Sequence, residues 1–373
     1  MASIINGIGN LPRIIREINC RKLFLVIDSS YPYLNIKDTI EQLPVEGMVK
    51  FSGFTPNPVF EHVCDGVELL KSSHCDTIMA IGGGSAIDVA KCIKLAFLAE
   101  DGISALLPPM ASQDTALSGS RVPLIAVPTT AGTGSESTHN AVMYYKGVKQ
   151  TITHDGILPD YAILEPAVLQ SLPLYQKKCT MMDALCQGIE SWWSVNSTPE
   201  SRTYSRKAVE LIVANWRKYI FENDGPASAQ IMLAANYSGR AINIAQTTAP
   251  HAMSYKITSM YGLPHGHAVA ICLPEVWQYM LAHAEECVDA RGSRYLDNVF
   301  QEIAHSLSFT RPADAVTFMH SILTEMEMPY PVAKDRMNEI EMLTRSVNPL
   351  RLKNNPVGLS QSSLSALYES IVK

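Results

Sequence analysis

The chain has 373 residues, of which 47% are apolar and 18% are charged, and its formal net charge is −6. This composition is ordinary for a globular protein, and the length is sufficient for two domains or one large domain. A general nucleic-acid binder would normally be basic, so the acidic balance argues against that class.

The cysteine pattern and the N-terminal sequence bear on location. Eight cysteines are scattered without a CxxC pair, which is typical of buried thiols in a reducing compartment and not of a disulfide framework or zinc ribbon. The run MASIINGIGNLPRIIREI lacks a basic start followed by a long apolar segment, so we expect no signal peptide. No apolar stretch reaches the roughly 18 residues that span a membrane. We expect a cytoplasmic protein that binds neither nucleic acid nor membrane.

Short apolar runs typical of buried strands alternate with helical patterns in the first half of the chain. The strand-like runs are residues 22–28, 77–81, 122–128 and 161–166. Between the first two, apolar residues recur at helical spacing at Val59, Val63, Val67 and Leu70. Strands buried on both faces and separated by helices predict an α/β domain with a largely parallel sheet.

After about Pro173 the pattern becomes helical throughout. Thr198, followed by Pro199 and Glu200, is typical of a helix start. Further helical patterns cover residues 198–220, 227–246, 282–306, 313–326, 333–346 and 360–372. We therefore predict two domains, an α/β domain over residues 1–174 and an all-helical domain over residues 175–373.

Three glycines directly follow one predicted strand and precede a helix in the run MAIGGGSAIDVAK. Gly82, Gly83 and Gly84 would allow a phosphate to approach the backbone closely, next to the free N–H groups of a helix N-terminus. The run matches neither GxGxxG nor the Walker A motif. It indicates a pyrophosphate-binding loop, and a simple tight turn is the alternative.

A second loop, VPTTAGTGSEST over residues 127–138, also follows a predicted strand. Its hydroxyls, on Thr129, Thr130, Thr133 and Ser135, and its glycines suit a nucleotide or phosphate clamp. Two such loops at strand carboxyl ends fit the ligand crevice of an α/β domain. Asp28, at the end of the first run, either accepts hydrogen bonds from an adenosine ribose, which would disfavour a 2′-phosphate, or serves only as a turn residue.

A cluster of metal-ligand types lies in the helical part. His251 and His265 are placed on neighbouring elements, and imidazoles that converge in this way suit zinc or ferrous iron, although core or surface histidines are the alternative. In the upstream run TMMDALCQGIESWW, Asp183 and Gln187 lie one helical turn apart on the same face. The four side chains together would form a mixed nitrogen and oxygen site with a position open for substrate.

The sequence resembles the iron-containing (group III) alcohol dehydrogenases. The motifs that carry the resemblance occur in the family order over about residues 50–275: GFTPNP, AIGGGSAIDVAK, PLIAVPTTAGTGSE, ILPDYAILEP, MDALCQGIE and HAMSYKITSMYGLPHG. The resemblance implies a Rossmann-like dinucleotide-binding domain, an all-helical metal-binding domain of the dehydroquinate synthase-like type, and an active-site cleft between them.

The resemblance also implies roles for individual residues. Three metal ligands of the family correspond to Asp183, His251 and His265. The residues implied to bind the cofactor are Asp28, Asn57, Gly82, Gly83, Gly84, Ser85, Asp88, Thr129, Thr130, Thr133 and Lys149. The implied cofactors are NAD(H) or NADP(H), with Asp28 favouring NAD, and one divalent metal, either Fe²⁺ or Zn²⁺. The family also implies a homo-oligomer, which we expect to be a dimer.

The sequence departs from the common family pattern at three places. Gln187 replaces the family's fourth metal ligand, a histidine, so its membership of the site is open. Tyr255 and Lys256 replace a His-Pro pair, and His267 is added after the last ligand. Within the family, the runs around these residues are most similar to phosphonoacetaldehyde reductases.

The expected reaction is reduction of a small aldehyde to a primary alcohol, namely phosphonoacetaldehyde to 2-hydroxyethylphosphonate. The metal would polarise the aldehyde oxygen while NAD(P)H delivers hydride. His267, Tyr255 or water would supply the proton, and His267 is preferred because an imidazole titrates near neutral pH. Lys256, with Arg240 as a second candidate, would bind the phosphonate. The alternatives are a dehydrogenase for another short-chain alcohol, diol or sugar-derived alcohol, and a metal-free nucleotide-binding protein without catalysis.

Overall fold

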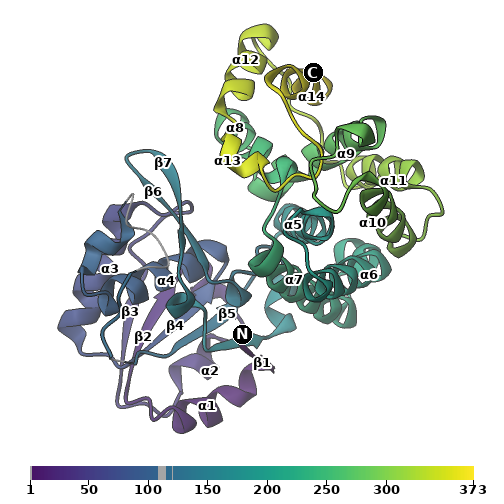
Figure 1. Cartoon of the computed structure of the whole chain (residues 1–373). Coiled ribbons are helices and arrows are strands. Elements are labelled where there is room, and N and C mark those ends of the chain that lie inside the picture. Colours follow the sequence, from purple (N-terminus) through teal and green to yellow (C-terminus); the bar gives the residue numbers. More distant parts are fainter. Residues whose placement is uncertain (1, 108–114, 120) are drawn as a thin grey trace. The chain divides into compact units, whose positions relative to one another are not determined.

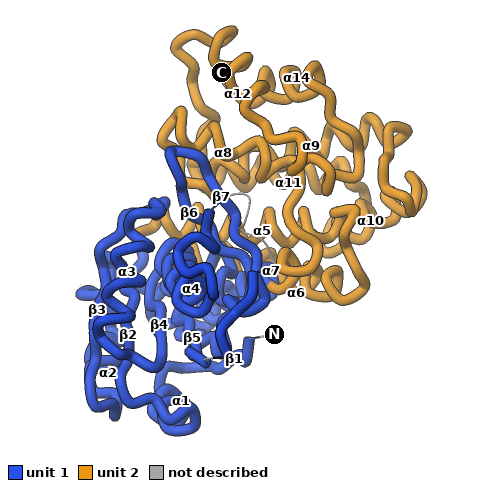
Figure 2. Tube along the Cα trace, turned by 60° about the vertical axis from the view of Figure 1, so that its left-hand side comes forward, with its two compact units in different colours: residues 1–172, 223–239 blue, residues 173–222, 240–373 orange. Residues whose placement is uncertain are grey.

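The computed structural model describes residues 2–107, 115–119 and 121–373 (Figure 1). It divides into two compact units, one of residues 1–172 and 223–239 and one of residues 173–222 and 240–373 (Figure 2). The first unit carries the sheet and the second consists of helices. The α/β and all-helical parts predicted from the sequence are thus confirmed as classes of structure.

The first unit is built on a six-stranded parallel sheet in the order β1-β8-β5-β4-β2-β3. Its strands are β1 (Ser3–Asn6), β2 (Lys22–Ile27), β3 (Gly47–Phe51), β4 (Thr77–Gly82), β5 (Leu124–Pro128) and β8 (Tyr161–Leu164). The strands β2, β4 and β5 are almost wholly buried, which explains why they appear in the sequence as continuous apolar runs. A separate antiparallel hairpin pairs β6 (Asn140–Tyr145) with β7 (Val148–Thr153).

Helices cover this sheet and set the position of the glycine loop. They are α1 (Leu11–Glu17), α2 (Lys37–Glu41), α3 (Phe60–Ser73) and α4 (Gly84–Leu98), with short 3₁₀ turns at Ile8–Asn10, Tyr31–Tyr33, Gly102–Leu106, Ser135–Ser137, Asp155–Ile157 and Pro166–Ser171. The central helix α4 is buried along most of its length and packs on β2, β4 and β5. Its start therefore lies where β4 ends.

The first unit also takes in part of a later helix, α7 (Gly225–Ala245), up to residue 239. The predicted two-piece division assigned this segment to the helical domain. Two contacts explain its place: the backbones of Gly134 and Gly239 meet so closely that a Cβ on Gly134 would lie 2.4 Å from the Gly239 Cα, and Asn236 Nδ2 donates to Glu136 Oε1 at 2.9 Å and to Ser137 Oγ at 2.7 Å.

The second unit is a group of packed helices. They are α5 (Leu174–Trp193), α6 (Pro199–Phe221), the end of α7, α8 (Ala249–Tyr261), α9 (His265–Ala282), α10 (Ser293–Ser306), α11 (Pro312–Glu325), α12 (Arg336–Ser346), α13 (Pro349–Leu352) and α14 (Gln361–Ile371), with a 3₁₀ turn at Ala284–Glu286. The helix α5 packs against α6 and α9, and α9 also packs against α8 and α11. Thr198 Oγ1 accepts from Ser201 N at the start of α6, which confirms the predicted cap.

The aromatic core of the second unit lies beside α5. The rings of Trp193, Trp277 and Phe300 contact one another with centroid separations of 5.6 to 6.3 Å, and these side chains are almost fully buried. Aromatic contacts of this kind stabilise a core beyond the area that they bury. No helix in the described part of the chain is long and apolar enough to cross a membrane.

Candidate active site

Three helices of the second unit bring together the predicted metal ligands. Asp183 comes from α5, His251 from α8 and His265 from the first position of α9, and one potential ligand atom of each lies within 4.8 Å of the others. Asp183 and His251 are buried, and His265 is half-buried. The imidazole rings of the two histidines are 5.3 Å apart between centroids.

The connection between α8 and α9 explains why the two histidines converge. Gly262 ends α8 in the left-handed conformation with φ 67°, a backbone geometry that favours glycine. Pro264 precedes His265 and starts α9. The chain therefore reverses within three residues and places the start of α9 beside α8.

The charges around His251 fit a bound cation. Its Nδ1 lies 2.5 Å from Glu190 Oε1, and its Nε2 lies 3.3 Å from Asp183 Oδ1. Glu190 accepts the Nδ1 proton, which leaves a lone pair on Nε2 facing a carboxylate oxygen, and these repel unless a proton or a cation lies between them. Burial alone would lower the pKa of His251, but the carboxylates of Glu190 and Asp183 raise it to about 10.

The side chains of Asp183, His251 and His265 therefore suit a divalent metal ion. Within residues 2–107, 115–119 and 121–373, Nε2 of His251 is buried without a hydrogen-bond partner, as expected of a nitrogen that binds a metal. One carboxylate and two imidazoles suit iron or zinc. Asp183, His251 and His265 are the residues that would hold the ion.

Gln187 lies beside this cluster, one turn after Asp183 on α5. Its Nε2 donates to Asp183 Oδ2 at 3.2 Å, and the side chain is buried. The structure therefore places Gln187 in contact with a ligand carboxylate.

His267 lies apart from the other histidines. Two residues along a helix correspond to about 200° of rotation, so His265 and His267 project from opposite sides of α9. The Nε2 of His267 donates to the Pro329 carbonyl at 3.0 Å, and its Nδ1 lies 2.7 Å from Tyr175 Oη, so both ring nitrogens are occupied. Burial lowers the pKa of His267.

The remaining predicted residues of this unit are partly exposed. Tyr255 stacks on His265, with centroids 5.7 Å apart and 19° between the rings. Lys256 follows it on α8 and is half-buried. Arg240 lies over the Tyr204 ring at 5.6 Å. The structure thus brings Tyr255 to the cluster through His265, while Arg240 contacts a different helix, α6.

The glycine loop of the first unit lies at the point where the strand order reverses, between β2 and β4. Ligands of open α/β sheets bind at such a point. Gly83 N donates to Asp28 Oδ2 at 3.1 Å, and Ser30 donates to Asp28 Oδ1 through its backbone nitrogen at 2.9 Å and its hydroxyl at 2.5 Å. Asp28 therefore joins the end of β2 to the loop. A Cβ on Gly82 would lie 2.5 Å from Asp28 Oδ2, so only glycine fits there.

The second loop lies against the first. Thr129 N donates to Gly82 O at 3.0 Å, and Thr130 and Thr133 border Gly83 and Gly84, whose added Cβ atoms would lie 3.5 Å and 2.8 Å from them. The structure therefore brings the predicted pyrophosphate loop and the predicted threonines into one place. Ser85 is in the first turn of α4, next to both.

Two side chains of α4, the buried Lys91 and the half-buried Asp88, hold the second loop. Lys91 is fully buried, and its Nζ donates to Ser135 O at 2.6 Å, Thr138 Oγ1 at 3.0 Å and Asn140 O at 2.7 Å. Burial lowers the pKa of Lys91 to about 8. Asp88 accepts from Ser135 Oγ at 2.7 Å, and burial raises its pKa. The residues predicted from the sequence include Asp88 but not Lys91, which is the last residue of the AIGGGSAIDVAK motif.

Asn57 and Lys149 lie outside the two loops. Asn57 is exposed and has φ 58°, a left-handed conformation that asparagine adopts more readily than most residues. Lys149 is on β7, and its charge opposes the rise in the pKa of Asp88.

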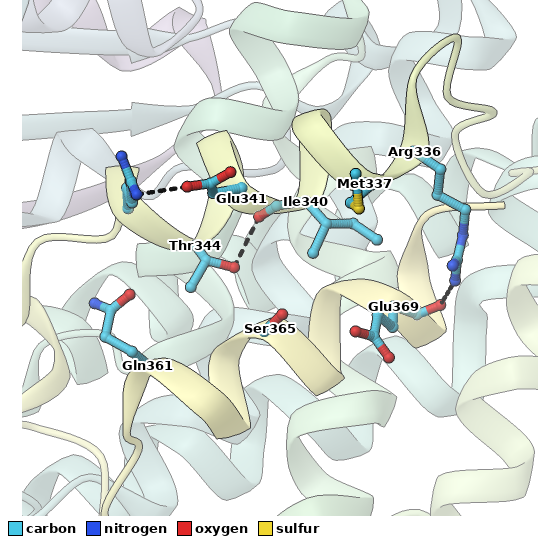
Figure 3. A pocket seen from close by; sticks show the side chains of 9 residues that line it. Arg336, Met337, Ile340, Glu341, Thr344, Gln361, Ser365 and Glu369 are labelled. Atoms are coloured by element: carbon cyan, nitrogen blue, oxygen red, sulfur yellow. Dashed lines mark hydrogen bonds and ion pairs between the residues drawn. The ribbon is translucent and has the colours of Figure 1, made fainter.

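A separate hollow of about 520 Å³ lies between α12 and α14 (Figure 3). Its lining, drawn from residues 336–369 of the described chain, includes none of the predicted site residues. Arg336 donates to the carbonyls of Val372 and Glu369, and Arg345 pairs with Glu341. Both arginines are therefore already engaged in contacts within α12 and with the end of α14.

A parallel α/β unit with a glycine-rich loop, and a helical unit that gathers one carboxylate and two imidazoles, are features expected of a metal-dependent dehydrogenase. The model of the iron-containing alcohol dehydrogenases matches residues 3–166, and that of the C-terminal part of the Fe-containing alcohol dehydrogenase family matches residues 178–372. The chain belongs to the iron-containing alcohol dehydrogenase family and is an NAD(P)-dependent oxidoreductase.

Individual relatives differ in substrate. The phosphonoacetaldehyde reductase of Streptomyces viridochromogenes is 35% identical over 311 residues, which cover 80% of this chain and 76% of the relative. The 1,3-propanediol dehydrogenase of Citrobacter freundii is 31% identical over 76% of this chain and 74% of its own length. The solved structure of sulfoacetaldehyde reductase from Bifidobacterium kashiwanohense in complex with NAD⁺ is 25% identical, with a TM-score of 0.86 and coverage of 99% of this chain and 96% of that one.

Proposed function

We propose that this enzyme reduces phosphonoacetaldehyde to 2-hydroxyethylphosphonate with NADH and one divalent metal, Fe²⁺ or Zn²⁺. The observation that supports the chemistry is the group of Asp183, His251 and His265, in which Asp183 and His251 are buried and His265 is half-buried. The similarity to a phosphonoacetaldehyde reductase and to a sulfoacetaldehyde reductase supports the substrate, because both names describe a two-carbon aldehyde with an anionic group.

Each unit contributes a separate part of the proposed reaction. When bound, the metal supplies Lewis-acid polarisation of the carbonyl oxygen and NADH supplies hydride. Asp183, His251 and His265 hold the metal. Gly82, Gly83 and Gly84 let the pyrophosphate approach the backbone where β4 ends and α4 begins. Because Gly83 N already donates to Asp28 Oδ2, the N–H groups of Gly84 and Ser85 in the first turn of α4 bind the pyrophosphate. Asp28, already bonded to Gly83 and Ser30, favours NAD over NADP through its negative charge next to this loop.

The proton for the alcohol oxygen comes from Tyr255 or from water. Tyr255 stacks on His265 and so lies next to a proposed ligand. His267 has both ring nitrogens occupied by Pro329 and Tyr175, so we give it a supporting role, in which it fixes the first turn of α9. This revises the sequence-based preference for His267 as the proton donor.

Lys256 is the proposed phosphonate-binding residue. It follows Tyr255 on α8 and is half-buried, and an ammonium group is a compact charge suited to a phosphonate dianion. Arg240 is the second candidate. Its guanidinium lies over the Tyr204 ring, so the same group would have to contact both this ring and the substrate.

Replacement of Lys256 by alanine should raise KM for phosphonoacetaldehyde about tenfold or more and leave propanal reduction nearly unchanged. The reason is that a charge-assisted contact contributes roughly 1.5–3 kcal/mol, and propanal has no charge to lose. Steady-state kinetics with both aldehydes measure the difference. Arg206→Ala on α6, where Arg206 lies near Glu302 at the surface, serves as the charge-matched control. Equal losses on both aldehydes would remove the anion-binding role.

Replacement of Gln187 by histidine should tighten metal binding about tenfold or more, because an imidazole is a better donor than a neutral amide. The nearby Asp183 contact places the new ring beside the cluster. Competition between the protein and a chromophoric chelator for Zn²⁺ measures the change. An unchanged metal affinity would place Gln187 outside the coordination sphere.

A substrate panel tests the proposed function as a whole. The purified enzyme, supplied separately with Fe²⁺ and Zn²⁺, is assayed with NADH and NADPH on phosphonoacetaldehyde, sulfoacetaldehyde and propanal, and with NAD⁺ and NADP⁺ on 1,3-propanediol. We expect the highest kcat/KM with phosphonoacetaldehyde and NADH. A higher kcat/KM for the diol or for propanal would show that phosphonoacetaldehyde is not the substrate. The absence of both metal and hydride transfer would favour a binding protein without catalysis. Light scattering in the same buffer measures the molar mass in solution and so tests the expected dimer.

A further inference from the structure

Glu190 is a fully buried carboxylate to which the proposed reaction gives no role. It lies on α5, seven residues after Asp183 and three after Gln187, and its exposed fraction is 0%. A buried carboxylate is strongly unfavourable unless donors surround it. The hydrogen-bond partners of Glu190 therefore indicate its role.

Both oxygens of Glu190 are bonded to one short segment of the second unit. Oε1 accepts from His251 Nδ1 at 2.5 Å, and Oε2 accepts from Thr248 N at 2.8 Å and from Thr248 Oγ1 at 3.0 Å. Thr248 Oγ1 in turn accepts from Trp193 Nε1 at 2.9 Å. Oε2 also accepts from His251 N at 3.5 Å, so the carboxylate contacts both Thr248 and His251, and Trp193 holds the threonine hydroxyl in its orientation.

This arrangement gives α8 its N-terminal cap. Thr248 is the N-cap residue, and its own side chain makes no capping bond. Glu190 from α5 instead accepts a hydrogen bond from the backbone N–H of Thr248. Its negative charge also interacts favourably with the positive end of the α8 dipole. The carboxylate thereby joins α5, which carries Asp183, to the start of α8, which carries His251.

The same carboxylate fixes the ring of His251. Acceptance of the Nδ1 proton by Oε1 selects the tautomer whose Nε2 bears the lone pair, and Nε2 is the atom that lies 3.3 Å from Asp183 Oδ1. A histidine that binds a metal through one nitrogen commonly donates its other N–H to a carboxylate, which fixes the ring and makes the ligand more basic.

We propose that Glu190 is a positioning residue that orients His251 toward the metal and thereby sets the affinity of the site for its ion. This inference rests on the proposed metal site. Glu190 does not touch the substrate or the cofactor in this role, and its effect passes through His251 and through the cap of α8.

The test is metal affinity of the full chain with Glu190→Gln. Glutamine keeps the size of the side chain but has one acceptor oxygen, so it can serve either the Thr248 N–H or the His251 N–H and not both. Wild-type and variant proteins are stripped of metal and titrated with Zn²⁺ against a chromophoric chelator. We expect the affinity of the variant to fall about 10- to 100-fold, and the visible spectrum of the Co²⁺-loaded protein to change.

The matched control is Asp289→Asn, which alters a buried carboxylate of the same unit that is bonded to Arg291 and not to the cluster. It should lower the melting temperature and leave Zn²⁺ affinity unchanged. If Glu190→Gln does not fold, Trp193→Phe keeps the carboxylate and removes the bond that orients Thr248, and it should weaken Zn²⁺ binding in the same direction.

The outcomes separate this inference from the function on which it rests. A wild-type protein that binds no stoichiometric Zn²⁺ refutes the metal site itself. A wild-type protein that binds the ion, together with a folded Glu190→Gln of equal affinity, refutes only the role of Glu190. Equal weakening in Asp289→Asn would also refute that role, because the effect would then be one of general stability.

Discussion

Asp183→Asn is expected to purify with little metal and to lose about a thousandfold or more in kcat/KM. Asp183 is the only anionic member of the group that Asp183, His251 and His265 form within the described chain, and the amide that replaces it is neutral. Lewis-acid stabilisation by a metal contributes several kcal/mol to the transition state, and about 4 kcal/mol corresponds to a thousandfold in rate. Metal analysis and steady-state kinetics measure the two effects.

The interpretation of this variant needs a folding control. Circular dichroism and thermal melting establish that Asp183→Asn is folded, and Asp314→Asn provides a carboxylate replacement on the surface of the same unit, where Asp314 pairs with Arg311. The control should retain its metal and its activity. Stoichiometric metal and full activity in Asp183→Asn would mean that the ion binds elsewhere in the chain.

The central strands could be predicted from the sequence because burial on both faces leaves continuous apolar runs. The runs at 22–28, 77–81, 122–128 and 161–166 correspond to β2, β4, β5 and β8. The edge strands β1 and β3 were not predicted. Each pairs with only one neighbour and is only partly buried, so the sequences SIIN and GMVKF show no such run.

The assignment of residues 223–239 to the first unit depends on contacts that the sequence pattern does not express. The segment is a helix by its pattern, as predicted, but a helical pattern does not identify the partner of the helix. The partner is determined by the close approach of Gly134 and Gly239 and by the bonds of Asn236 to Glu136 and Ser137. Such contacts join residues about 100 positions apart.

The site was predictable to different extents for different residues. Residue type and motif order predict Asp183, His251 and His265, and the structure brings one potential ligand atom of each within 4.8 Å of the others. Glu190 was missed, although it ends the quoted motif MDALCQGIE, because its importance depends on bonds to α8. The placement of His267 could have been expected, since a residue two positions after a ligand on a helix faces away from it.

Gly266→Ala is expected to separate the ligands without changing any of them. Gly266 follows His265 at the start of α9, and a Cβ there would lie 2.0 Å from Cys179 O and 3.0 Å from Asp183 Cβ, both on α5. An ordinary carbon–oxygen contact is about 3.3 Å, so α9 must move away from α5 by about 1 Å. A backbone oxygen inside a helix cannot yield as a flexible side chain would.

That displacement acts on the metal site directly, because His265 moves with α9 while Asp183 stays with α5. Metal–ligand distances tolerate about 0.2 Å, and a misplacement of about 1 Å costs about a hundredfold in rate. We therefore expect Gly266→Ala to weaken Zn²⁺ binding and to lower kcat/KM by about a hundredfold. Overpacking should also lower the free energy of unfolding by about 1–3 kcal/mol. Zn²⁺ titration, kinetics and denaturant unfolding measure the three effects.

Gly262→Ala distinguishes ligand displacement from general loss of stability. Gly262 lies in the same connection and has φ 67°, but an added Cβ would meet nothing within 4 Å. Its replacement should cost about 1–2 kcal/mol through backbone strain and leave Zn²⁺ affinity unchanged. If instead Gly262→Ala loses the metal and Gly266→Ala keeps it, the turn before α9 sets the ligand geometry. The contact between α9 and α5 would then serve only the stability of the fold.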